Sequence, residues 1–336
     1  MLQRFAIIAG LTAVLLSSCS NDLDINAQWK ETTVVFGLMS KQDSVHYLRL
    51  SKAFLGEGDA MKFASIADSV YYDPQVIEVK IEEYLNNSIT RTFELQAATD
   101  IPKDPGIFAW PGQVVYTFQT PANEGLNPMA KYQLTVHNKK SNHVLKAETQ
   151  VLGNMNFDMP LGTMNFYPQH SLNVKWKSVE GGALYEVFVS FLYREYHLNN
   201  PSDTVRKFVE LNLGRLNMEF KGAFQSLNKT MTNLDMYRTI GLELAPPDPN
   251  DPVSRIADSL LVRINVADED LMTYLLVNQP SNTLAQERPQ FTNVENGVGI
   301  FASRGSYTKK FRIGDYTVDS LRSNQFTRHL NFEERP

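Results

Sequence analysis

Histidine is the side chain best suited to acid–base and metal chemistry near neutral pH, and this chain has six of them. They are scattered along the sequence: His46, His137, His143, His170, His197 and His329. His46 lies on the opposite strand face from Val45 and Tyr47, which predicts that it faces solvent. No two of them have the i, i+4 spacing around a glutamate that a zinc-binding helix needs, and no G-x-S-x-G motif or P-loop is present. We therefore expect no enzyme, no metal site and no cofactor. Catalysis by carboxylates alone stays open as an alternative.

Hydroxyl groups that follow aspartate form the one pattern that exceeds what composition predicts. Asp followed by Ser or Thr is in every case followed by Val or Leu, and this occurs five times where about one such triplet is expected. The hydroxyl residues are Ser44, Ser69, Thr204, Ser259 and Ser320. The pattern resembles the O-glycosylation sequon of Bacteroidota, which implies that at least one hydroxyl is modified. The alternative is a turn at Asp-Ser followed by the first residue of a strand.

The first eighteen residues indicate export. Arg4 precedes an apolar run from Phe5 to Leu16, which at twelve residues is too short for a bilayer-spanning helix of about 20 residues. Small and polar residues follow at once. This layout is typical of a secretory signal peptide over residues 1–18, and it disfavours the alternative of a buried N-terminal helix.

The residues Leu16-Ser17-Ser18-Cys19 resemble the bacterial lipoprotein box, and Cys19 is the only cysteine in the chain. The resemblance implies that Cys19 carries lipid, which anchors the protein to a membrane. Residues 19–30 then form a tether. Within it, Ser20, Asp22 and Asp24 resemble the signal that sends Bacteroidota lipoproteins to the cell surface. A plain polar linker, with the protein on the periplasmic face, is the alternative.

Length and net charge bear on the number of domains and on the kind of partner. The 336 residues suffice for about two domains, and 43% hydrophobic residues indicate a folded chain. Lys+Arg 32 against Asp+Glu 37 gives a net charge of −5, which is a poor electrostatic match for nucleic acid.

Beyond residue 30 the hydrophobic period is two, which predicts antiparallel strands buried on one face. We expect a mainly β fold of tandem antiparallel β-sandwich domains with a few short helices. Residues 31–152 fit an immunoglobulin-like sandwich, and residues 153–336 a second β-rich domain. Trp176 and Tyr185 resemble the opening of a fibronectin type III module, where both are core residues. A sugar-stacking platform is the less favoured alternative.

Two short helices are expected among the strands. Residues 59–67 have helical spacing. Asp268-Glu269-Asp270 suits the N-cap and acidic first turn of a helix over residues 268–279.

Exposed loops are the expected recognition surface of a sandwich without catalytic spacing. The candidates are residues 107–113, the proline-rich residues 246–252 and the turn at Asn296-Gly297. Trp110 is the sharpest of these, because Pro111 and Gly112 follow it and favour a projecting turn. We expect it to contact a partner. The alternative is that its ring folds back onto the sandwich.

Taken together, the signal peptide, the lipoprotein box, the β domains and the late strand–helix segment resemble uncharacterised outer-membrane lipoproteins of Bacteroidota. Such proteins are often encoded beside TonB-dependent transporters. The resemblance implies a surface-exposed binding protein that assists an outer-membrane transporter or assembly, with a TonB-dependent protein as its partner. A structural or adhesive protein that binds glycan or a neighbouring cell is the alternative.

Overall fold

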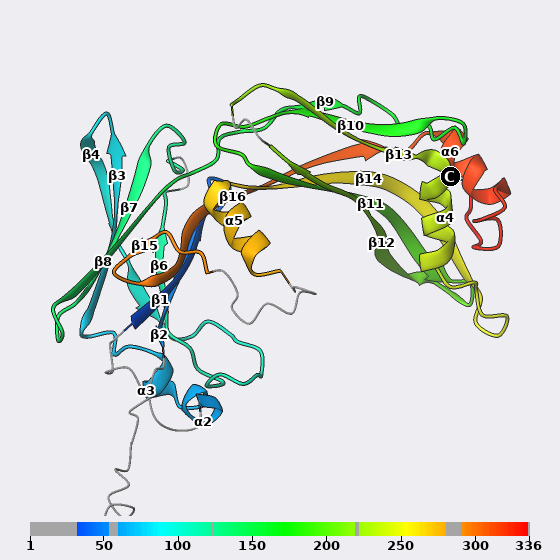
Figure 1. Cartoon of the computed structure of the whole chain (residues 1–336). Coiled ribbons are helices and arrows are strands. Elements are labelled where there is room, and N and C mark those ends of the chain that lie inside the picture. Colours follow the sequence, from blue (N-terminus) through cyan, green and yellow to red (C-terminus); the bar gives the residue numbers. More distant parts are fainter. Residues whose placement is uncertain (1–31, 54–59, 122–123, 219–221, 280–289, 335–336) are drawn as a thin grey trace, which may run out of the picture.

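The computed structural model describes residues 32–53, 60–121, 124–218, 222–279 and 290–334. The fold is mainly β, with 51% strand and 13% helix, and its sheets stack in a sandwich-like arrangement (Figure 1). This confirms the predicted fold class. In β3 (Ile77–Leu85), for example, Ile77, Val79 and Ile81 are buried while the charged residues between them face outward.

An eight-stranded sheet runs through the whole molecule in the order β12-β11-β14-β16-β1-β2-β6-β5. Its strands are β12 (Asn200–Asn217), β11 (Leu184–His197), β14 (Val253–Ala267), β16 (Val298–Arg312), β1 (Thr32–Met39), β2 (Val45–Ala53), β6 (Val115–Gln119) and β5 (Gln96–Ala98). All neighbours are antiparallel except β1 and β16, which run parallel with Val34 opposite Val298.

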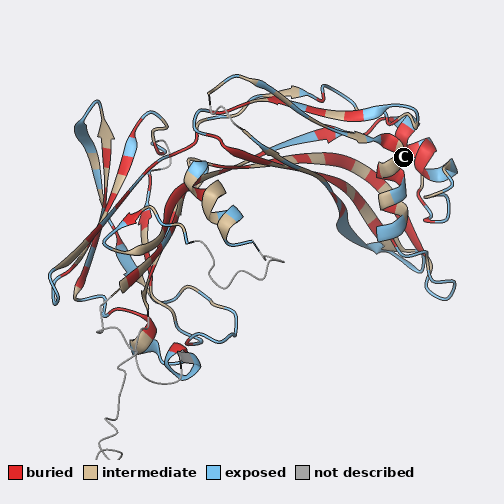
Figure 2. Cartoon of the chain, in the orientation of Figure 1, coloured by how far each residue is buried: buried red, intermediate tan, exposed pale blue. Residues whose placement is uncertain are grey.

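A five-stranded sheet packs on β1, β2, β6 and β5 and completes the first sandwich. Its order is β15-β8-β7-β3-β4, with β15 (Val294–Glu295), β8 (His143–Gln150), β7 (Lys131–Asn138) and β4 (Ser88–Glu94) beside β3. Val35 and Leu48 from one sheet and Ile81 and Leu134 from the other share one hydrophobic core. Figure 2 shows buried residues along the strands of both sheets.

The second sandwich forms where a three-stranded sheet covers the other half of the long sheet. This sheet has the order β13-β10-β9, with β13 (Ser226–Thr232), β10 (Ser171–Lys177) and β9 (Phe157–Met159). Trp176 and Tyr185 are both 0% exposed in its core, with ring centroids 5.8 Å apart. The predicted core role of this pair is confirmed, and the sugar-platform alternative is wrong because neither ring reaches solvent.

The sheet crosses the domain boundary that the sequence predicts after residue 152. β15 pairs with β8 and β16 pairs with β1, so late residues complete the first sandwich. Gly299 makes this possible: its φ is +108°, and a Cβ there would lie 2.0 Å from the Val35 carbonyl oxygen. The eight-stranded and five-stranded sheets therefore each contain strands from both predicted ranges, 31–152 and 153–336.

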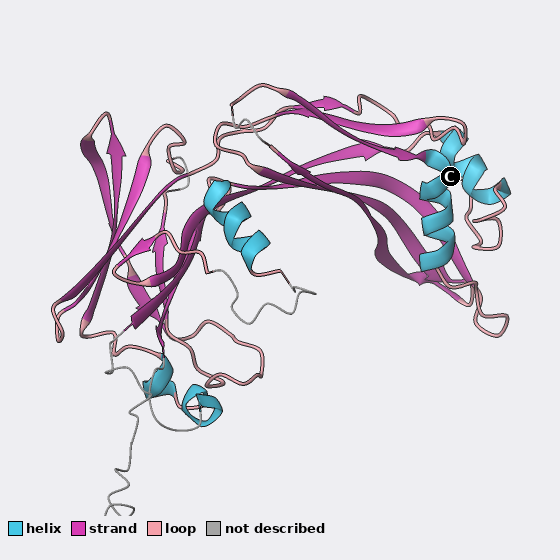
Figure 3. Ribbon diagram, viewed as in Figure 1, coloured by secondary structure: helices cyan, strands magenta, loops and turns pink. Residues whose placement is uncertain are grey.

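The helices lie beside the sheets, and one of them packs against β16 in the middle of the molecule (Figure 3). The predicted acidic-capped helix is present as α5 (Glu269–Val277), and the Asp268 carboxylate accepts the Leu271 N–H at 2.9 Å. The helical stretch predicted near residues 59–67 is present as α2 (Ala60–Ala64) and α3 (Ala67–Val70).

Two further helices were not predicted. They are α4 (Asn233–Glu243) and α6 (Asp315–Ser323), which cover the far end of the second sandwich. In α4, the Thr232 hydroxyl accepts the Asp235 N–H at 3.1 Å and so caps the helix.

Candidate functional site

The residues predicted for lipidation and export, Cys19, Ser20, Asp22 and Asp24, lie outside the described residues. Within the described chain, no helix combines the length and apolar character needed to cross a membrane. The first described residue, Thr32, begins β1 and follows Cys19 by 13 positions. Since one extended residue spans at most about 3.6 Å, that length of chain reaches no farther than about 47 Å. The end of the molecule where β1 begins is therefore within reach of an anchor at Cys19.

Helix α3 lies at that same end. Thr32 is opposite Ala53, the last residue of β2. The Thr33 hydroxyl lies 2.8 Å from the Tyr72 hydroxyl, and Lys52 Nζ donates to the Asp68 carbonyl at 2.8 Å. Figure 1 shows α2 and α3 together below the start of β1.

Trp110 lies in the loop between β5 and β6, and it is 55% exposed. Its indole Nε1 donates to the Lys103 carbonyl at 2.9 Å, which satisfies the polar end of the side chain and leaves much of the apolar ring open. Trp110 is therefore not a core residue. Its contact with a partner stays a prediction.

The Trp110 loop is fixed to its neighbours by hydrogen bonds. The buried Ala109 donates its N–H to the Ala64 carbonyl of α2 at 2.7 Å. Lys103 Nζ donates to the Ala109 carbonyl at 2.8 Å and to the Tyr71 hydroxyl at 3.3 Å. The loop therefore presents Trp110 from a defined position, which favours recognition because little conformational entropy is lost on binding.

The hydrogen bond between Ala109 and Ala64 joins the Trp110 loop to α2, and large apolar side chains are exposed on or next to both segments. We call them the Trp110 surface: Met61, Phe63, Ile66, Ile107, Phe108 and Trp110. Two cations flank it, with Lys103 Nζ 5.8 Å and Arg49 Cζ 5.9 Å from the centroid of the Phe108 ring. Exposed apolar groups rimmed by polar ones mark interaction sites, and tryptophan is enriched among residues that dominate binding energy.

Comparison with known proteins assigns no family. No protein-family model and no curated protein sequence matches the chain. Among solved structures, it is similar to trypsin-activated alpha-2-macroglobulin from Escherichia coli, with 9% identity and a TM-score of 0.19. The match covers 85% of this chain and 16% of that one. A likeness at this TM-score supports no conclusion about fold or function.

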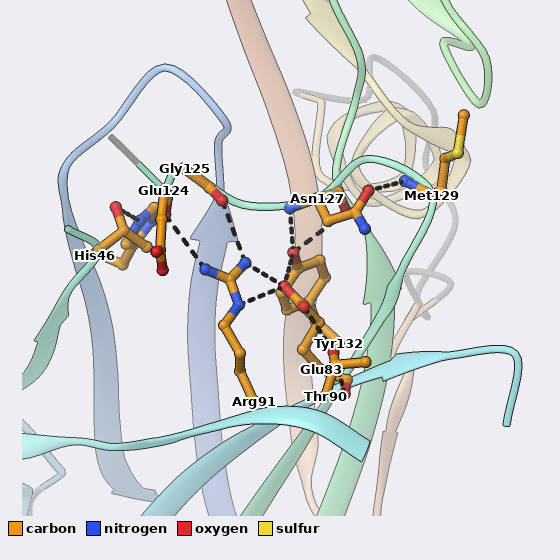
Figure 4. A network of polar contacts seen from close by, with 10 residues as sticks. His46, Glu83, Thr90, Arg91, Glu124, Gly125, Asn127, Met129 and Tyr132 are labelled. Carbon is orange, nitrogen blue, oxygen red and sulfur yellow. Dashed lines mark hydrogen bonds and ion pairs between the residues drawn. The ribbon is translucent and has the colours of Figure 1, made fainter. Parts of the chain in front are cut away.

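A buried carboxylate in the first sandwich has the chemistry of a candidate acid, but its partners give it a structural role (Figure 4). Glu83 on β3 accepts hydrogen bonds from the Tyr132 hydroxyl at 2.7 Å, the Thr90 hydroxyl at 2.7 Å and Arg91 Nε at 3.1 Å. Arg91 also donates to the carbonyls of Glu124 and Gly125, at 3.2 and 3.1 Å.

Charge is balanced within this network. Burial acts to raise the pKa of Glu83, but the hydrogen bonds from Arg91, Thr90 and Tyr132 outweigh it, so the pKa is lowered. An ionised carboxylate whose lone pairs are all engaged is a poor proton donor. The network instead joins the outer strands β3 and β4 to the loop before β7.

Histidine placement corrects one expectation. Residue 46 was predicted to face solvent because it alternates with Val45 and Tyr47, yet His46 is 2% exposed and stacks on Phe118 with centroids 4.5 Å apart. Burial lowers its pKa. In the described residues, no group of three or more His, Cys, Asp or Glu side chains could hold a metal ion.

The hydroxyls of the Asp-Ser and Asp-Thr triplets differ in accessibility. Ser44 and Thr204 are exposed, Ser69 is half-buried, and Ser259 and Ser320 are buried. The turn interpretation fits Ser44, which directly precedes β2, but Ser69 and Ser320 lie in helices and Thr204 and Ser259 lie within strands. Modification of the folded chain is therefore sterically open at Ser44 and Thr204 and blocked at Ser259 and Ser320.

The two other candidate loops are less suited to recognition. At the tight turn, Asn296 has a φ of 59° and its Nδ2 donates to the Val144 carbonyl at 3.2 Å, so the turn is held against β8. In the proline-rich loop, Asp251 lies 2.9 Å from His197 Nδ1.

The sequence predicts the loop over residues 107–113, which contains Ile107, Phe108 and Trp110, but it does not predict the apolar residues beside that loop. Met61, Phe63 and Ile66 come near the loop through the hydrogen bond between Ala64 and Ala109, which are 45 residues apart in the sequence.

Proposed function

We propose that this chain is a lipid-anchored envelope protein that works by binding, without enzymatic chemistry, and assists an outer-membrane transporter or assembly. The signal-peptide layout and the lipoprotein box at Cys19 support the anchor. The single observation that carries the binding role is the place of the Trp110 surface, at the end of the first sandwich where β1 begins.

An integral membrane protein is the partner that this geometry favours. A protein anchored at Cys19 presents the end near Thr32 toward its membrane, because the chain before Thr32 is short. In this orientation the Trp110 surface can contact an integral protein of that membrane. A TonB-dependent transporter is the partner that the resemblance of the sequence implies.

The anchor is tested by Cys19→Ala. We expect the variant to lose membrane association or to stay uncleaved, because lipid on Cys19 is the proposed attachment. Detergent phase partitioning and intact mass measure both outcomes. A correctly cleaved variant that remains in the membrane fraction contradicts the anchor.

The proposed signal for transport to the cell surface is tested separately by replacing Asp22 and Asp24 with Ala. We expect less protein at the cell surface with lipidation unchanged, as measured by protease shaving of intact cells. Equal digestion of both proteins would leave residues 20–24 as a plain linker.

The partner is tested by affinity purification from detergent-solubilised outer membranes. We expect Trp110→Ala to reduce recovery of one integral outer-membrane protein by roughly tenfold or more, as for an interface hot spot. Leu242→Ala, an exposed apolar change on α4 at the opposite end, is the matched control and keeps full recovery. Melting temperatures of both variants show whether the loss comes from contact or from unfolding.

If the unmodified protein, Trp110→Ala and Leu242→Ala all recover the same amount of the outer-membrane protein, this role for the Trp110 surface is contradicted. Glycan binding by the purified protein, with no protein partner recovered, would instead establish the adhesive alternative.

A further inference from the structure

The long sheet of the second sandwich has a second face that the three-stranded sheet does not cover. On β11, the core residues Tyr185, Val187, Val189, Phe191 and Tyr193 alternate with residues of this second face. Cross-strand register places the side chains of β12, β14 and β16 beside them. We call it the outer face. It carries many cations in a protein whose net charge is −5.

Over most of the outer face, each cation has an acidic neighbour. Arg263 lies 2.7 Å from Glu210, Arg215 lies 2.9 Å from Glu186, and Lys310 lies 3.3 Å from Asp258. The second and third pairs join neighbouring strands, and the first spans β11 to join β14 to β12, so charges on this part of the sheet surface are balanced across strands.

One end of the outer face breaks this rule. Arg194 on β11 lies directly opposite Arg206 on β12, and like charges at such a position are destabilising. Arg312 on β16 lies opposite Ser259 of β14, three residues from Ile256, which lies opposite Arg194. Within the described parts of the chain, none of these three arginines forms an ion pair with a carboxylate.

A pocket of about 550 Å³ opens at this corner. Arg194, Lys310 and Arg312 line it, and its one carboxylate, Asp258, is already engaged by Lys310 and by the Ser259 hydroxyl at 3.2 Å. Ser259 is 3% exposed, so it forms part of the floor. The register between β11 and β14 also shifts by one residue here, a bulge of the kind that often lies beside functional sites.

We propose that this pocket binds a phosphate group, either as the free ion or as the end of a larger phosphorylated molecule. Guanidinium groups pair with phosphate oxygens in bidentate geometry. A dianion between Arg194 and Arg312 supplies the negative charge that this corner lacks, and it offsets the repulsion between Arg194 and Arg206. Because the pocket is open to solvent on one side, a sugar or lipid attached to the phosphate can extend away from the sheet.

The proposal is independent of the membrane anchor and of the Trp110 surface. Its test is thermal denaturation of the mature full-length protein in detergent while inorganic phosphate is titrated, with sodium chloride at matched ionic strength as the reference. We expect a saturable rise in melting temperature with phosphate only, since a ligand that binds the folded state stabilises it.

Substitutions locate the effect. We expect Arg194→Gln and Arg312→Gln each to weaken phosphate binding at least tenfold. Arg215→Gln, which removes a paired cation from the same face, is the control and binds as the unmodified protein does. Without phosphate, Arg194→Gln is expected to melt no lower than the unmodified protein, because it relieves a like-charge contact.

Titration of glucose 6-phosphate and of phosphatidic acid dispersed in the same detergent distinguishes the sources. Tighter binding of either one than of inorganic phosphate identifies its class as the ligand, and equal binding identifies the free ion. An equal rise with sodium chloride overturns the proposal, as does equal weakening by Arg215→Gln.

Discussion

Thr149 of β8 donates a hydrogen bond of 3.2 Å to the carboxylate of Asp268, the residue that caps α5. The same carboxylate accepts the Ser303 N–H of β16 at 2.6 Å. One side chain thus connects a strand of the five-stranded sheet, a strand of the long sheet and a helix. Burial raises the pKa of Asp268 to about 6, despite these hydrogen bonds.

This pKa predicts that stability rises in mild acid. The folded chain takes up a proton on Asp268 below pH 6, whereas an unfolded aspartate does so only below about pH 4. The free energy of unfolding should therefore increase by up to about 3 kcal/mol as pH falls from 6 to 4, through this group alone. Asp268→Asn should abolish that increase in urea titrations, and Glu269→Gln is the control. An unchanged pH profile in Asp268→Asn would contradict the assignment.

Arg91→Met should destabilise the first sandwich. It leaves the buried Glu83 carboxylate without its cation, and removing one partner of a buried ion pair costs about 3–5 kcal/mol. The double change Glu83→Gln with Arg91→Met should recover most of this loss, because no buried charge remains. Denaturant unfolding of the three proteins measures both effects. If the double variant is no more stable than Arg91→Met, charge burial is not the cause.

Burial of His46 predicts that the free energy of unfolding falls as the pH is lowered below about 6.5. Because burial lowers its pKa, folded His46 stays neutral while an unfolded histidine gains a proton below about pH 6.5. Its contribution to the free energy of unfolding is therefore complete above pH 7 and declines as pH falls below 6.5. His46→Phe, which keeps a ring against Phe118, should remove this decline. His329→Gln, at an exposed site, should leave it unchanged.

Glycosylation, where it occurs, should follow accessibility. We expect the native protein to be heavier than the same chain made in a host without the pathway, after allowance for lipid. Ser44→Ala and Thr204→Val should each lower the native mass, and Ser259→Ala should not, because Ser259 is buried. Intact mass spectrometry decides between these outcomes. Identical masses from both hosts would leave the triplets without a role in modification.

The strands and much of the core could be predicted from the sequence, because apolar and polar residues alternate along a strand that is buried on one face. This worked for β3 and for Trp176. α4 was missed although Thr232 and Asp235 have cap spacing and the buried residues Met236, Tyr237 and Ile240 recur at helical spacing. Leu242 on the same helix is 80% exposed, and an apolar residue outside the buried stripe weakens the helical pattern.

The sites were less predictable, since they depend on register and on distant contacts. The pairing of Arg194 with Arg206 follows from a hairpin whose register shifts at two places, and no local pattern reveals such shifts. The outcome for His46 has another origin: it shares the core-facing side of β2 with Leu48 and Leu50, and Phe118 lies beside it on β6.

The parallel pairing of β1 with β16 sets the order in which the protein can assemble. β1 is made first, yet its ladder with β16 uses residues 298–303, which follow it by more than 260 positions. Synthesis delivers the chain from the N-terminus, so the edge of β1 stays open until the residues of β16 have been made. Contacts at such separation slow folding and leave unpaired edges open to aggregation. A fragment that ends at residue 152 therefore lacks β15 and β16, two of the strands that complete its own sandwich, and we expect that it does not fold alone.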